Sequence, residues 1–196
     1  MSGYGFGVRA LVALIVLWTA PAPAAASTRV VHWSPFAADG ALRPGLVATP
    51  AFGGDCYIGS FAAHGAYRCI AGHFLRDPCF ADPGRDDAVV CVGDPFTHGV
   101  VRLRVSGDLD RSASAPAGLV WAVRLAGGQR CVFFAGGATS VDAAGRRANY
   151  GCSGSPTVLW GSPRRGPGTW RIRASRSFTP GPERRVAIRT AYIGQA

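Results

Sequence analysis

Four segments of the chain alternate apolar and polar side chains with a period of two. In the clearest one, Val101, Leu103 and Val105 alternate with Arg102 and Arg104. The same alternation runs through residues 119–125, 170–173 and 186–189. Because successive side chains of a strand point to opposite faces, this pattern predicts strands that each bury one face.

Shorter apolar runs predict further, buried strands. These runs are residues 67–70, 88–92, 131–134 and 157–160. Gly127-Gly128 stands between two predicted strands and fits a two-residue hairpin turn, because both glycines can take a positive φ. Beyond the first 26 residues no segment shows a sustained helical period. The pattern therefore predicts a mostly β fold, an antiparallel sandwich or barrel of short strands.

Three stretches rich in Gly, Pro and Ser interrupt the apolar pattern, at residues 112–118, 161–168 and 177–182. Too little chain lies beyond each stretch to fold by itself. We therefore interpret them as surface loops inside one domain.

The first 26 residues have the three parts of a secretory signal peptide. Arg9 precedes the apolar run 10–18, and Pro21 and Pro23 follow before Ala24-Ala25-Ala26. The apolar run is shorter than the roughly 20 residues that a membrane span needs. We predict cleavage after Ala26, a single secreted β domain from 27–196 and no transmembrane span in it. The alternative is an uncleaved membrane anchor.

All six cysteines lie after the predicted cleavage point. An even number of cysteines in an exported chain predicts structural disulfides. Sequence alone cannot choose among the possible pairings, although pairing consecutive cysteines keeps every loop local. Each bridge would stabilise the fold by about 3 kcal/mol. The cysteines are Cys56, Cys69, Cys79, Cys91, Cys131 and Cys152.

The sequence around these cysteines resembles a group of small exported proteins from GC-rich Gram-positive bacteria, a group without a known activity. The resemblance covers roughly residues 50–175 and implies export and disulfides. It brings no ligand or catalytic residue. The segments that carry it include Gly54-Asp55-Cys56, Asp77-Pro78-Cys79-Phe80 and Asn149-Tyr150-Gly151-Cys152.

Positive charge is concentrated in the second half of the chain. All 21 basic residues are arginine, and the net charge is +10. Residues 27–98 hold five Arg and seven Asp, whereas residues 99–196 hold fifteen Arg, three Asp and one Glu. A strongly basic half attracts anionic partners, most strongly at low salt.

We therefore expect a non-enzymatic domain whose basic half binds an anionic cell-surface polymer, lipid headgroups or an acidic partner. Intracellular nucleic acid is not an expected partner of an exported chain, and neither a cofactor nor a metal is expected. The alternative is that the arginines only keep the domain soluble and protect its sheet edges. Aromatic residues among the arginines (Trp160, Trp170, Phe178 and Tyr192) either stack on a ligand or belong to the core. The predicted anion-binding residues are Arg102, Arg104, Arg164, Arg165, Arg171, Arg173 and Arg184.

A secreted serine hydrolase is the alternative from another functional class. His64 and Ser153 lie in segments with a faint resemblance to chymotrypsin-like proteases, and Asp87 or Asp94 would orient the imidazole. Two departures weaken this resemblance: Gly65 follows the histidine where that family has Cys, and the nucleophile follows Cys152 where that family has Asp. The acidic stretch 82–87 could instead hold calcium, but its Pro and Gly favour a solvated turn.

Overall fold

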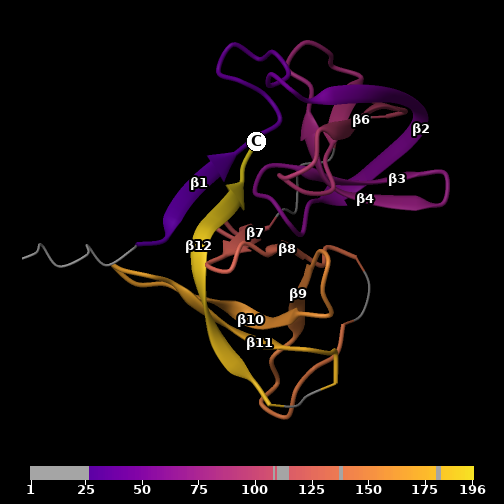
Figure 1. The fold of residues 1–196 in the computed structure, drawn as a ribbon. Helices are drawn as coiled ribbons and strands as arrows, with labels where there is room; N and C mark the ends of the chain where they lie inside the picture. The colour runs from indigo at the N-terminus through magenta and orange to yellow at the C-terminus, as the bar shows by residue number, and fades with distance from the viewer. Residues whose placement is uncertain (1–26, 108, 110–114, 137–138, 180–181) are drawn as a thin grey trace, which may run out of the picture.

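The computed structural model describes residues 27–107, 109, 115–136, 139–179 and 182–196. The predicted signal peptide, residues 1–26, lies outside the described residues. Within them the chain is all β, with no helix and so none that could cross a bilayer. The strands form two closed barrels, one above the other in Figure 1. The fold class predicted from the alternating pattern is thereby confirmed.

The first barrel is built from five strands in chain order. Its neighbouring strands are antiparallel, and the long strand β2 closes the barrel by running parallel to β6, with Val47 opposite Gly99. The strands are β2 (Val47–Gly59), β3 (Tyr67–Ala71), β4 (Phe74–Ala81), β5 (Ala88–Cys91) and β6 (Gly99–Val105).

The second barrel is built from six antiparallel strands and is closed by the pairing of its last strand, β12, with its first, β7. Strand β1 (Arg29–Trp33) adds to the outside of this closure, parallel to β12, with Arg29 opposite Thr190. The strands are β7 (Val120–Leu125), β8 (Arg130–Phe133), β9 (Ala148–Cys152), β10 (Val158–Arg164), β11 (Arg171–Ser175) and β12 (Arg184–Gly194).

A shared aromatic cluster joins the two barrels. Trp33 on β1 contacts Trp121 of the second barrel, with ring centroids 5.3 Å apart, and Phe80 of the first barrel, 6.1 Å away. Trp121 and Phe80 are almost completely buried. Each barrel also has a hydrophobic core of its own. The shared cluster packs the two barrels against each other as one unit.

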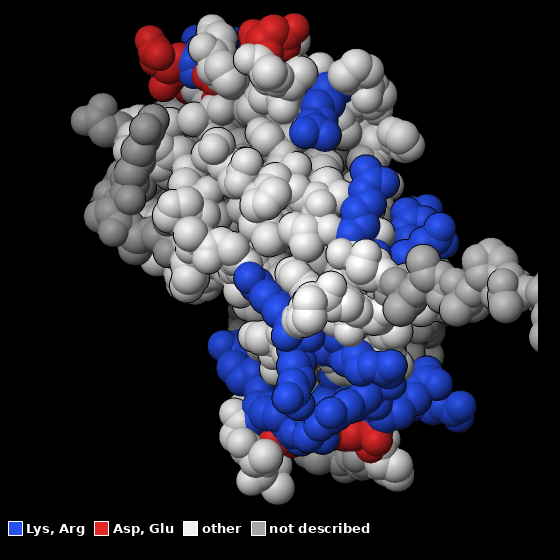
Figure 2. Space-filling view, turned by 90° about the vertical axis from the view of Figure 1, so that its left-hand side faces the viewer, with Lys and Arg blue, Asp and Glu red and all other residues white. Residues whose placement is uncertain are grey.

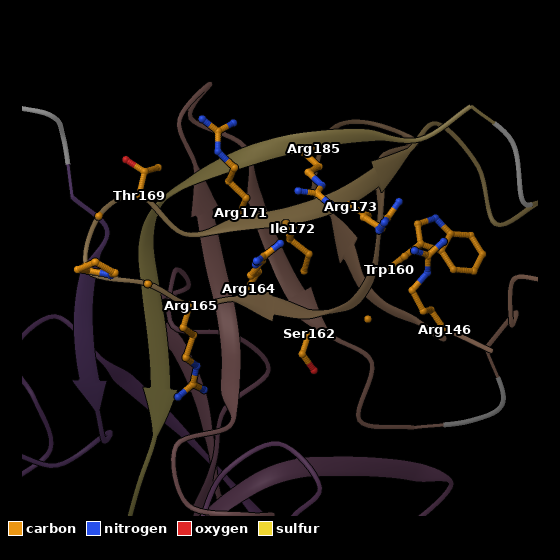
Figure 3. Close-up of a pocket in the computed structure, with 14 residues that line it drawn as sticks. Arg146, Trp160, Ser162, Arg164, Arg165, Thr169, Arg171, Ile172, Arg173 and Arg185 are labelled. Atoms are coloured by element: carbon orange, nitrogen blue, oxygen red, sulfur yellow. The ribbon is translucent and has the colours of Figure 1, made fainter. Parts of the chain in front are cut away.

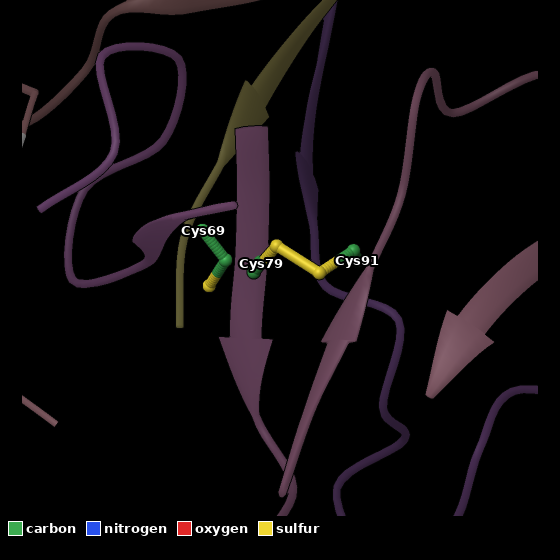
Figure 4. A group of neighbouring side chains, drawn as sticks. All are labelled: Cys69, Cys79 and Cys91. Carbon is green, nitrogen blue, oxygen red and sulfur yellow. A yellow bond between two sulfur atoms is a disulfide. The ribbon is translucent and has the colours of Figure 1, made fainter. Parts of the chain in front are cut away.

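Three disulfides join consecutive cysteines: Cys56–Cys69, Cys79–Cys91 and Cys131–Cys152. The predicted bridges and the local pairing are confirmed, and they indicate that the chain folds in an oxidising environment. The sulfurs of Cys69, Cys79 and Cys91 lie within 4.8 Å of one another in the first barrel (Figure 4). Since each of them is bonded to another sulfur, this cluster is a pair of adjacent disulfides and offers no thiolate to a metal.

The hairpin between β7 and β8 differs from the prediction. Only Gly128 takes a positive φ, of 86°, and its amide donates to the Leu125 carbonyl. The Leu125 amide in turn donates to the Gln129 carbonyl. The loop is therefore three residues long and ends in a left-handed glycine, so the predicted two-residue turn is wrong.

Candidate anion-binding site

Six of the fifteen arginines in residues 99–196 line one side of the second barrel. Figure 2 shows these basic side chains gathered over the lower barrel, with acidic side chains only at their edge. Strands β10, β11 and β12 supply most of them. The charge excess counted along the sequence is thus a surface patch in the folded chain.

A bulge in β10 brings Arg164 into this patch. Gly161 takes a φ of 67° inside the strand, and the register with β11 shifts between Trp160 and Arg164. A side chain at Gly161 would strain this conformation. Beyond the bulge β10 pairs with β11 again, so the predicted loop 161–168 is wrong for its first four residues.

The register places arginines directly opposite arginines. Arg164 lies opposite Arg171 on β10 and β11, and Arg173 lies opposite Arg185 on β11 and β12. Arg171 and Arg173 are two residues apart on β11, and the buried Ile172 between them points into the barrel. All four arginines therefore share the outer face, and we call them the arginine row. Like charges directly opposite each other destabilise a sheet, so this arrangement works against the stability of the fold.

The arginine row lines an open hollow of about 710 Å³. Arg146 from the loop before β9 and Arg165 from the loop after β10 complete its basic lining. Ser162 and Thr169 add hydroxyl groups. In Figure 3 the guanidinium groups of Arg164, Arg171 and Arg173 stand at separate points over the sheet and do not converge.

Two carboxylates neutralise one end of the hollow. Glu183 accepts hydrogen bonds from Arg146 at 3.0 and 3.1 Å and from Arg173 at 3.1 Å. Asp142 accepts a hydrogen bond from Arg146 Nε at 2.6 Å. Burial alone would raise the pKa of Asp142, but hydrogen bonds from Arg146 and from the Ala144 amide outweigh it and lower that pKa. Both Arg146 and Arg173 are thus held in place by charge.

The other end of the hollow keeps its charge. Within the described part of the chain, no carboxylate lies within ion-pair distance of Arg164, Arg171 or Arg185. Arg165 donates to the Gly118 carbonyl, which positions its side chain without neutralising it. Counting the residues that the structure describes, six arginines face two carboxylates, so the hollow carries four uncompensated positive charges. An anion fits this environment electrostatically.

Of the four aromatic residues near the patch, Trp160, Trp170 and Tyr192 are buried or partly buried, whereas Phe178 is 47% exposed. Trp160 is 1% exposed, and its Nε1 donates to Ser175 Oγ at 2.8 Å. Trp170 is half-buried, with the Arg165 guanidinium 5.2 Å from its ring centroid. Two further aromatic pairs complete the set: Tyr192 with Phe96, and Phe178 with Phe134. The interpretation of these residues as packing residues fits the structure better than a stacking platform.

Three of the seven predicted anion-binding residues lie outside the hollow. Arg102 and Arg104 are on β6 of the first barrel, where their Nε atoms lie 2.8 Å from Asp82 Oδ2 and 2.6 Å from Asp87 Oδ2. The Nε–H of Arg102 is not directed at the nearby oxygen, so that contact is an ion pair without a hydrogen bond. Arg184 begins β12 and borders a neighbouring hollow beside Ser175 and Thr179.

The structure brings Arg164, Arg165, Arg171 and Arg173 together, as predicted, and adds Arg146 and Arg185. Sequence reasoning missed Arg185 because only the β11–β12 register places it opposite Arg173. Arg185 directly follows the predicted Arg184, so in a strand its side chain points to the opposite face. This adjacency was the one signal in the sequence that could have identified Arg185. Arg146 comes from a loop with no such signal.

His64 and Ser153 lie at opposite ends of β7. The His64 amide donates to the Gly194 carbonyl, next to the pairing of Ile193 with Val120, where β7 begins. Ser153 donates through its amide and its hydroxyl to the carbonyl of Arg130, which pairs with Arg124 near the end of β7. The structure therefore does not bring the two proposed catalytic side chains together.

The other candidate residues for that chemistry are engaged elsewhere. Asp87 binds Arg85 and Arg104, and Asp94 accepts a hydrogen bond from the Phe96 amide at 2.7 Å. Asp82 faces Arg102 and caps the turn at Gly84. The acidic stretch 82–87 is a turn, as predicted, but it is only partly solvated: Asp82 is buried beside Arg102, and Asp87 binds Arg85 and Arg104.

No protein-family model, curated protein or solved structure matches this chain. The resemblance to small exported bacterial proteins therefore stays a prediction from the cysteine segments. Function is inferred from the geometry and charge of the hollow.

Proposed function

We propose that this chain is a secreted, non-enzymatic β domain that binds an anionic surface polymer through the arginine-lined hollow. The observation that carries the proposal is the set of three arginines, Arg164, Arg171 and Arg185, that lack a carboxylate partner in the described residues. The predicted signal peptide and the three disulfides support a location outside the cytoplasm.

The alignment of the arginines favours binding over a role in solubility alone. Charges that only keep a protein soluble work best when they are spread out and mixed in sign. Here Arg164 faces Arg171 across β10 and β11 with no carboxylate beside either of them in the described residues, and this repulsion lowers sheet stability. A bound polyanion would remove that repulsion, so the arrangement stabilises the complex more than the free protein.

The binding would depend steeply on salt. Each phosphate that a protein neutralises on a dense polyanion releases condensed counterions, and the affinity falls as salt rises. In an exposed hollow the arginines are also screened directly by the solution ions.

The test is retention of the folded, oxidised protein on a matrix that carries an anionic polymer, measured from low to high salt. A variant with Arg164→Gln, Arg171→Gln and Arg185→Gln should elute at much lower salt than the wild type. The matched control is Arg85→Gln, Arg104→Gln and Arg130→Gln, which removes the same charge from exposed arginines outside the hollow. Equal elution of the two variants would assign retention to net charge and refute the site.

A further inference from the structure

The first barrel holds the two most exposed aromatic side chains that the structure describes. Phe52 on β2 is 75% exposed, and Phe74 on β4 is 67% exposed. Ile70 on β3 and Leu75 on β4 are exposed as well, although Gly136 of the segment after β8 lies close to Leu75. Large apolar side chains that stand together on a surface mark an interaction site, whereas scattered single ones do not.

The β3–β4 hairpin projects from the first barrel. Strand β4 pairs with β5 only from Cys79 to Ala81, so the half of β4 that begins at Phe74 extends past β5. In Figure 1 the turn of this hairpin lies at the right-hand end of the barrel. Ile70 pairs with Leu75 next to the turn. Because successive side chains of a strand alternate, Phe74 lies on the opposite face from Leu75. The hairpin therefore exposes apolar side chains on both of its faces.

Phe52 extends this apolar surface on the neighbouring strand. Gly54 of β2 pairs with Ala71 of β3, which in turn pairs with Phe74 of β4. Phe52 stands two residues before Gly54, inside a bulge where the register of β2 with β6 shifts between Ala51 and Gly54. The two phenylalanines thus lie on the two strands that flank β3, at the same end of the sheet.

The shape of this surface favours a lipid bilayer over a protein partner. Contact with a protein surface would cover one face of the hairpin and leave the other in water. The boundary between lipid headgroups and acyl chains surrounds a segment that enters it, so it covers both faces at once. Phe and Leu are among the side chains that enter this boundary, to a depth of about 5–10 Å.

The charged side chains around the hairpin fit a lipid surface and limit how deeply it enters. The Arg76 guanidinium lies 6.0 Å from the Phe74 ring centroid, and within the described residues no carboxylate is within ion-pair distance of it. An arginine packs its stem on apolar neighbours while its charge stays at the polar level, where it binds phosphate oxygens. The exposed Asp55 pairs with Ile70. Because a carboxylate is costly in hydrocarbon, insertion should stop at this level.

From these observations we infer that the first barrel docks on the surface of a lipid bilayer, without spanning it. Phe52 and Phe74 enter the boundary between headgroups and acyl chains, and Arg76 contacts the lipid phosphates. This surface is separate from the arginine-lined hollow of the second barrel, so the inference goes beyond the proposed function and does not depend on it. Because apolar insertion drives the binding, it persists on zwitterionic lipid and at high salt.

The experiment measures co-sedimentation of the oxidised protein with phosphatidylcholine vesicles at high salt, where the arginines of the second barrel are screened. The chain starts at residue 27, because the apolar run 10–18 would itself enter lipid, and every strand lies beyond that point. We expect the wild type to sediment with the vesicles. Phe52→Ala and Phe74→Ala should each lower the partition coefficient by about tenfold, since each removes one inserted ring.

Two further variants report on the matched control and on depth. Phe178→Ala removes an exposed phenylalanine of the second barrel and should leave the partition coefficient unchanged. Asp55→Asn removes the carboxylate at the edge of the inserted surface and should raise it severalfold. All of these side chains are exposed, so the variants should keep the melting temperature of the wild type, which is measured alongside.

Three outcomes would overturn the inference. The first is no sedimentation of the folded wild type with phosphatidylcholine, including binding that requires added phosphatidylglycerol and disappears at high salt, which would belong to the arginines. The second is wild-type sedimentation of both Phe52→Ala and Phe74→Ala. The third is self-association without lipid that Phe74→Ala abolishes, which would make the hairpin an interface between copies of the chain.

Discussion

Arg173 and Arg185 face each other across β11 and β12, yet among the described residues only Arg173 of the two has a carboxylate partner, that of Glu183. Both Glu183 oxygens are engaged by arginines that line the hollow. The chain thus contains an internal anion at one end of the surface that we propose binds an external one. The arginines of the hollow therefore fall into two groups. Carboxylates hold and neutralise Arg146 and Arg173, whereas Arg164, Arg171 and Arg185 have no carboxylate partner in the described residues.

Replacing this internal anion should strengthen polyanion binding. Glu183→Gln frees Arg173 and adds one positive charge to the hollow, so affinity should rise severalfold at low salt and the salt dependence should steepen. Partly exposed ion pairs contribute at most about 1 kcal/mol, so the variant should remain folded. Binding isotherms at several salt concentrations check this. Weaker binding by a folded Glu183→Gln protein would show that Glu183 chiefly positions Arg173.

Breaking the like-charge pair should stabilise the free protein. Arg171→Gln removes the repulsion with Arg164, and at low salt it should raise the free energy of unfolding by roughly 0.2–1 kcal/mol. The gain should disappear near 1 M salt, where the screening length is only about 3 Å. Urea denaturation at both salt concentrations measures the effect, with Arg130→Gln as the control. If the free energy of unfolding changes by the same amount at both salt concentrations, the effect comes from packing and the prediction is wrong.

Removing the disulfide of the second barrel should lower stability without removing the site. Cys131 and Cys152 are 21 residues apart in the sequence. Replacing both with alanine should reduce the free energy of unfolding by about 3 kcal/mol. Because the two barrels share the Trp33 cluster, we expect one cooperative transition. Under conditions where the variant stays folded, its polyanion affinity should be unchanged, since the bridge joins β8 and β9. Lost affinity in the folded variant would contradict this.

Asp87 should make stability depend on pH in acid. Hydrogen bonds from Arg104 and then Arg85 lower the pKa of Asp87 from 3.8 to about 2. A carboxyl group whose pKa is lower in the folded state stabilises the fold above its unfolded pKa and loses that effect as the pH falls through the folded value. The wild type should therefore melt above Asp87→Asn from neutral pH to about 4, and the difference should vanish near pH 2. Asp86→Asn is the control at the neighbouring position. If the wild type still melts above Asp87→Asn at pH 2, the stabilisation does not come from the lowered pKa of Asp87.

The strands that alternate most regularly were the ones predictable from sequence. Residues 101–105, 119–125, 170–173 and 186–189 all fall largely within strands of the two barrels. Strands β2 and β4 escaped prediction because Pro50, the pair Gly53-Gly54 and Pro78 interrupt their pattern. These residues are tolerated where a strand bulges or bends, and the register of β2 does shift near Gly54.

The charge of the candidate site could be predicted from the sequence, but its geometry could not. Counting arginines located the basic half, but it grouped Arg102 and Arg104 with residues of the other barrel. Their neutralisation by Asp82 and Asp87 depends on contacts across strands and turns. The facing of Arg173 and Arg185 likewise depends on register, which a single strand's pattern does not determine.

Strand β12 does three tasks at once: it closes the second barrel on β7, receives β1 and places Arg185 opposite Arg173. One strand therefore couples the closure of the second barrel to the completion of the arginine row. A substitution that weakens the pairing of β12 would remove Arg185 from its place opposite Arg173 at the same time as it opens the barrel.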